Sequence, residues 1–118
     1  MIEVTYYRNH NRVTIQGHAL SDEYGKDLVC AACSTLAVTL AANIRYLESK
    51  GYVTEAVSRL DPGEAELSCT PVTRYRDSVR QMFMAVCVGF EVLADQYPDY
   101  IRYKIHGLPW VCFQNVPC

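Results

Sequence analysis

The segment from Gly17 to Ser34 reads GHALSDEYGKDLVCAACS and contains the residues best suited to chemistry. His18 is expected at the end of a strand, and Cys30 in the first turn of a helix. A cysteine attacks as its thiolate, which the unpaired N–H groups and the dipole of a helix N-terminus favour. A histidine held nearby can accept the thiol proton. The segment therefore predicts a cysteine nucleophile with a histidine base, although a dyad is defined by geometry and not by spacing.

Asp27 is predicted to be the N-cap of this helix. Its short acidic side chain can accept the backbone N–H of the third helical position, which is Cys30. Alternatively, the Asp27 carboxylate could act as the charge partner of His18. The polar stretch from Leu20 to Lys26 is expected to be a loop that moves over the site, with Gly25 as its hinge.

Two β-hairpins are predicted from apolar residues that alternate with polar ones. The first turns at NHN, residues 9–11, and the second joins 52–60 to 64–69 through the turn Asp61-Pro62-Gly63. In the second hairpin, the alternation at 64–69 predicts one buried and one wet face. The inward-facing residues of the first hairpin are expected to be Ile2, Val4, Tyr6, Val13 and Ile15.

Helical spacing of apolar residues predicts two helices. One runs from Asp27 to about Ser49, and the other follows Pro71 and stops before Pro98. A last strand is expected at about 100–105. The predicted inner face of the first helix consists of Leu28, Ala32, Leu36, Leu40, Ile44 and Leu47. The order ββαββαβ predicts an α+β fold with two helices packed on one face of a mainly antiparallel sheet.

The length and composition fit one domain, and we divide the 118 residues into a domain at 1–106 and a C-terminal tail of unknown role at 107–118. The net charge of −2 offers no basic patch for direct nucleic-acid binding. Polar residues interrupt the apolar stretch at 28–44, which favours a buried helix over a membrane span. The first residues do not resemble a secretory signal, so a cytoplasmic location is expected and the six cysteines are interpreted as reduced thiols.

The linked motif in this segment resembles the Prp family of bacterial ribosomal-processing cysteine proteases. The resemblance consists of G-H-A, an acidic loop containing Tyr-Gly, and D-L-V-C-A-A-C-S on a helix, and the order of elements agrees over about residues 1–106. The residues in family positions are Gly17, His18, Ala19, Tyr24, Gly25, Asp27, Val29, Cys30, Ala31 and Ser34.

The resemblance implies a homodimer that removes a short N-terminal extension from a large-subunit ribosomal protein, number twenty-seven. It implies Cys30 as nucleophile and His18 as base, without metal or cofactor, and an apolar groove near the dyad that receives paired aromatic residues. Asp27 and Ser34 would be supporting residues. The substrate loop would contain Gly17, Ala19, Tyr24 and Gly25.

Cys33 departs from the family pattern, in which an aliphatic or small residue is usual, and creates a C-x-x-C with Cys30. Such a pair also suits a thiol–disulfide redox protein, with Cys33 as the resolving thiol. A metal site made of these two cysteines and His18 would need a fourth ligand. A noncatalytic dimeric module of ribosome assembly is the remaining alternative.

Overall fold

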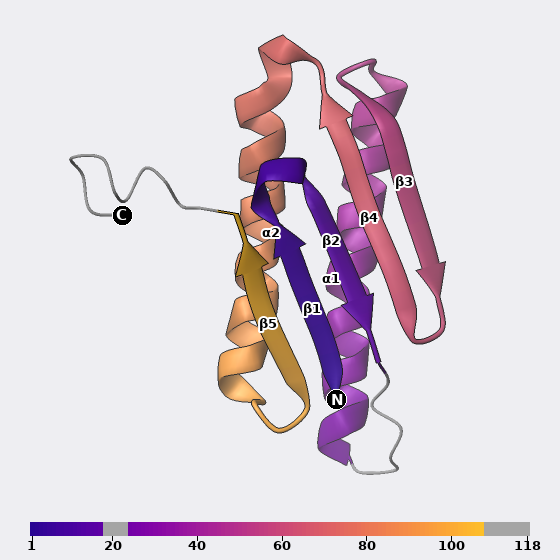
Figure 1. Cartoon of the computed structure of the whole chain (residues 1–118). Coiled ribbons are helices and arrows are strands. Elements are labelled where there is room, and N and C mark those ends of the chain that lie inside the picture. Colours follow the sequence, from indigo (N-terminus) through magenta and orange to yellow (C-terminus); the bar gives the residue numbers. More distant parts are fainter. Residues whose placement is uncertain (18–23, 108–118) are drawn as a thin grey trace, which may run out of the picture.

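A computed structural model of the chain describes residues 1–17 and 24–107, the side chains of 24–27 excepted. Within these residues, a five-stranded sheet is covered on one face by two long helices (Figure 1). The elements are β1 (Ile2–Tyr7), β2 (Arg12–Gln16), α1 (Tyr24–Ser49), β3 (Val53–Asp61), β4 (Glu64–Pro71), α2 (Arg76–Gln96) and β5 (Ile101–His106), with 3₁₀ turns at Arg8–His10 and Thr73–Tyr75. The predicted α+β fold and its element order are confirmed.

The sheet has the strand order β3-β4-β2-β1-β5. Every neighbouring pair is antiparallel except β1 and β5, which run parallel. Gln16 at the end of β2 pairs with Glu64 at the start of β4. The end of β2 therefore lies beside the turn that joins β3 to β4, although almost fifty residues separate these segments in the chain.

One continuous core fills the space between the sheet and the helices. The alternation predicted for the strands is confirmed, since Ile2, Val4 and Tyr6 of β1 are at most 3% exposed. The rings of Tyr6 and Phe83 stack at a centroid distance of 6.3 Å, which joins β1 to α2. The residues of β4 and α2 that reach this core are Ala65, Leu67, Cys69, Val79, Phe83, Cys87 and Phe90.

The buried face of α1 agrees with the predicted one at Leu40 and Ile44 and differs from it elsewhere. Leu28 is 44% exposed, whereas the neighbouring Val29 is fully buried. Steps of four residues overshoot one helical turn by about 40°, so a set of residues chosen at that interval winds off the buried face. The buried residues of α1 are Val29, Cys33, Ala37, Leu40, Ala41 and Ile44. By length and composition Leu28–Ser49 could also span a membrane, with a mean hydropathy of 1.6, but this buried face packs on the sheet.

The start of α1 corrects three predictions. The helix begins at Tyr24, so Asp27 is its fourth residue and not an N-cap, and Cys30 lies in the second turn. Residues 24–26 are helical and not part of a loop, and the rest of the predicted loop lies outside the described residues. A glycine inside a helix costs about 1 kcal/mol relative to alanine, so Gly25 does not prevent the helix from extending towards the N-terminus.

Candidate active site

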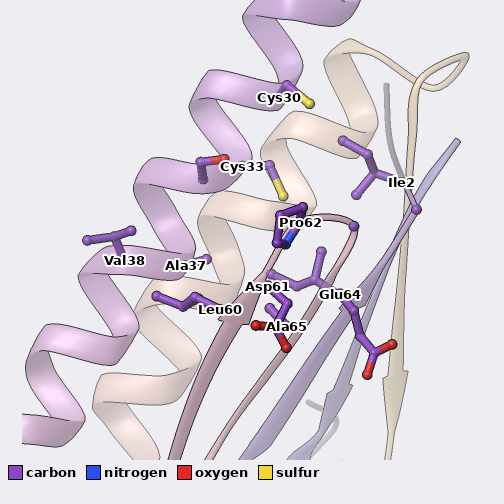
Figure 2. A pocket seen from close by; sticks show the side chains of 14 residues that line it. Ile2, Cys30, Cys33, Ala37, Val38, Leu60, Asp61, Pro62, Glu64 and Ala65 are labelled. Carbon is purple, nitrogen blue, oxygen red and sulfur yellow. The ribbon is translucent and has the colours of Figure 1, made fainter. Parts of the chain in front are cut away.

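A cavity of about 320 Å³ opens between α1 and the β3–β4 turn (Figure 2). Three parts of the chain meet around it: the second to fourth turns of α1, the hairpin at 60–65, and the start of β1 with the end of β2. The lining residues are Ile2, Ile15, Gly17, Cys30, Cys33, Ser34, Ala37, Val38, Leu60, Asp61, Pro62, Gly63, Glu64 and Ala65. Most of these side chains are apolar, so the cavity suits an apolar group.

Cys30, Cys33, Ser34 and Ala37 reach the cavity because residues three and four apart share one face of a helix. Cys30 is half-buried and Ser34 is exposed, whereas Cys33 is only 4% exposed. Figure 2 shows both sulfur atoms on the same side of α1, with that of Cys33 directed towards Pro62 of the hairpin. Cys30 is therefore the thiol of this cavity that an incoming molecule can reach.

Burial separates Cys30 from the other described thiols. Burial raises the pKa of the Cys33 thiol to about 12, and charge repulsion by Cys30 makes a smaller contribution. Burial also raises the pKa of Cys69 to about 11 and that of Cys87 to about 12. These three thiols stay protonated at neutral pH and lie in the core. Among residues 1–17 and 24–107, Cys30 is the free cysteine that is not buried.

Gly17 fixes the point at which the chain leaves β2. Its φ is +101°, and a Cβ at this position would collide with the carbonyl oxygen of Met1, so no other residue fits without a shift. Its N–H donates a hydrogen bond of 2.9 Å to the carbonyl of Gly63. Gly17 also lines the cavity, so the segment that contains His18 departs from the edge of the cavity that holds Cys30.

Charges at the hairpin are largely paired with one another. Arg59 contacts Glu64 at 2.6 Å, Glu66 at 3.2 Å and Asp61 at 3.6 Å, and Arg12 contacts Glu66 at 2.9 Å. Hydrogen bonds from Arg12 and Arg59 lower the pKa of Glu66. Asp61 and Glu64 lie at the rim of the cavity with Arg59 close by, which reduces the acidic character of the rim.

The structure brings together three of the predicted site residues, namely Cys30, Ser34 and Gly17. His18 and Ala19 lie outside the described residues, and Tyr24, Gly25 and Asp27 are placed in the first turn of α1 by their backbone only. The hairpin wall of the cavity was not predicted from the sequence. The D-P-G turn was recognised, but only the sheet order shows that this turn meets α1.

A reachable thiol on a helix, facing an apolar cavity on an α+β scaffold, is the arrangement that a cysteine-nucleophile enzyme requires. The chain belongs to the cysteine protease Prp family, whose model matches residues 1–102. The family resemblance predicted from the motif is thus confirmed.

Known relatives agree in sequence and in fold. The ribosomal processing cysteine protease Prp of Mycoplasma genitalium is 31% identical over 98 residues, which cover 79% of this chain and 86% of that protein. The crystal structure of a Streptococcus mutans protein is 32% identical, covers 90% of this chain and 94% of that one, and superposes with a TM-score of 0.68.

A Staphylococcus aureus protein, the ribosomal processing protease Prp, was solved with a covalently linked product peptide. It is 21% identical, covers 88% of this chain and 96% of that one, and gives a TM-score of 0.61. At this identity the similarity shows the fold, and the predicted two-helix, mainly antiparallel architecture is confirmed by it.

Proposed function

We propose that this chain is an endopeptidase that removes the N-terminal extension of a large-subunit ribosomal protein, number twenty-seven, with Cys30 as nucleophile and His18 as base. The observation that supports it best is the half-buried Cys30 thiol at the wall of an apolar cavity. The Mycoplasma genitalium relative is named a ribosomal processing protease, and the Staphylococcus aureus protein has been solved with a substrate peptide.

In the proposed reaction, His18 accepts the thiol proton and the Cys30 sulfur attacks the scissile carbonyl. The imidazolium then protonates the leaving amine, and water hydrolyses the thioester. The N–H of Gly17 donates to the carbonyl of Gly63 at the cavity edge, so the residue before His18 is fixed beside the hairpin. Asp27 lies one turn before Cys30 and is the candidate partner for the imidazole, while Ser34 offers a hydroxyl to the bound peptide.

The cavity suits one of the paired aromatic residues that the resemblance implies in the substrate. Its apolar walls include Ile2 and Ile15 from the sheet, Ala37 from α1 and Leu60 from the hairpin. A volume of about 320 Å³ holds a large apolar side chain next to the reactive thiol. Burying that side chain would fix the scissile bond in register with Cys30.

The decisive experiment incubates the purified chain with the extended precursor and measures the product masses. We expect the precursor to be shortened by wild type and by Cys69→Ala, which removes a thiol of the core, but not by Cys30→Ala. His18→Ala should fail in the same way. An intact precursor with the wild-type chain, or processing by Cys30→Ala, would refute the assignment.

We also propose that the enzyme is a cytoplasmic homodimer. The four described cysteines are free thiols, in keeping with a reducing compartment. Met84 and Val88 of α2 and Ile105 of the edge strand β5 are 39%, 54% and 50% exposed and border one shallow depression, which a second copy would cover. Sedimentation should show a dimer that Val88→Glu weakens and that Val57→Glu, at the opposite sheet edge, leaves intact.

A further inference from the structure

The proposed hydrolysis leaves Cys33 without a role, although it lies in the wall of the reactive cavity. Cys30 and Cys33 are one helical turn apart on α1 and both line the cavity. Figure 2 shows their sulfur atoms on the same side of the helix. A second thiol, that of Cys33, therefore lies one turn further along α1 from the reachable thiol of Cys30, in the same cavity wall.

The spacing of the two residues is close to what a disulfide needs. Residues three apart on an α-helix have Cβ atoms about 5–6 Å apart, and a disulfide requires about 3.8 Å. Tightening one turn from α to 3₁₀ geometry makes such residues eclipse and shortens the gap. Tightening of this kind is frequent near helix ends, and Cys30 lies in the second turn of α1.

The two thiols differ in access, which sets the order of reaction. Cys30 is half-buried and borders an open cavity, so a small oxidant reaches it first. Cys33 is 4% exposed, and burial together with the neighbouring Cys30 raises its pKa to about 12. Cys33 is thus shielded from outside reagents, and its electrostatic interaction with Cys30 shows that the two thiols are neighbours.

We propose that Cys33 is a resolving thiol that captures the sulfenic acid formed by a peroxide at Cys30 and closes a reversible Cys30–Cys33 disulfide. The proposal rests on the proposed function in that Cys30 is the nucleophile whose loss stops proteolysis. The disulfide would turn the protease off under oxidative stress and would protect Cys30 from irreversible oxidation to sulfinic or sulfonic acid.

The chemistry balances with hydrogen peroxide as the oxidant. The Cys30 thiolate attacks one peroxide oxygen, so that an S–O bond forms, the O–O bond breaks and hydroxide leaves. The Cys33 sulfur then attacks the sulfenic sulfur, the S–S bond forms, and the S–O bond breaks. The departing hydroxide takes the Cys33 proton as water. Both thiols are oxidised by one peroxide, which is reduced to two waters.

The test treats the reduced full-length chain with hydrogen peroxide, alkylates the remaining thiols and digests with trypsin. Both cysteines lie in the fragment 27–45, between Lys26 and Arg45. In wild type and in the control Cys87→Ala, we expect this fragment to be lighter by two hydrogen atoms and unalkylated. Dithiothreitol should restore proteolysis in both.

Cys33→Ala and the bulkier Cys33→Val should instead gain oxygen atoms at Cys30. After reduction they should recover about ten-fold less activity than wild type. The proposal is overturned if the wild-type fragment gains oxygen without a disulfide, or if the Cys33 variants recover as wild type does. A disulfide in a chain that never cleaves the precursor, even when reduced, would refute the proposed function and leave the thiol pairing intact.

Discussion

Gly17→Ala tests whether the anchor of the histidine segment matters to catalysis. At φ +101° an alanine is strained, which costs on the order of 1–3 kcal/mol. The new methyl would also collide with the Met1 carbonyl at the start of β1, so β1 and β2 must shift at the cavity edge. We therefore expect the free energy of unfolding to fall by more than the strain alone and the rate of precursor cleavage to fall about ten-fold or more.

Gly51→Ala is the matched control. Gly51 also has a positive φ, +76°, but a Cβ there meets no atom within 4 Å, so the substitution adds backbone strain without a collision. Urea unfolding gives the free-energy loss of each variant, and kcat/KM on the extended precursor gives the effect on the site. The reasoning is wrong if Gly17→Ala costs no more stability than Gly51→Ala, or if both cleave the precursor at the wild-type rate.

Three further outcomes follow from the structure. Burial raises the pKa of the Cys87 thiol from 9.0 to about 12. The unfolded chain therefore loses this proton at a lower pH than the folded chain, and the free energy of unfolding is constant below pH 9 but declines from pH 9 towards 12 by about 1.4 kcal/mol per pH unit. Urea titrations at pH 8 and 10 should show this decline, and Cys87→Ala should reduce it. Val38→Trp, at an exposed position of the cavity wall, should raise the KM for the precursor and leave the unfolding midpoint near that of wild type. Phe90→Ala should cost about 3–5 kcal/mol in urea unfolding, because the ring is fully buried in the core.

The elements with a clear period could be predicted from the sequence. In β4, Ala65, Leu67 and Cys69 alternate with polar residues, and all three are buried as expected. Such alternation follows from local geometry, because successive side chains of a strand point to opposite faces. The end of α2 was equally predictable, since Pro98 lies two residues after its last residue, Gln96, and cannot continue a helix.

The start of α1 could not be predicted in the same way. Asp27 is a good N-cap residue, but it is also favourable inside the first turn, where acidic side chains interact well with the helix dipole. Whether Asp27 is the N-cap or lies inside the first turn depends on whether residues 24–26 can be helical. Gly25 disfavours helix there by only about 1 kcal/mol relative to alanine. Leu28 was misplaced for a related reason, since which helical face is buried depends on how α1 lies on β3 and β4.

The far wall of the cavity depends on the sheet order and not on any local signal. Because β2 lies between β1 and β4, the turn after β3 meets both the end of β2 and the cysteines of α1. The hydrogen bond from Gly17 to Gly63 then joins this turn to the segment that contains His18. In the proposed mechanism, a displacement of the hairpin by bound peptide would move Gly17, the residue before the proposed base, as well as the cavity wall, so we expect peptide binding and the position of that base to be coupled.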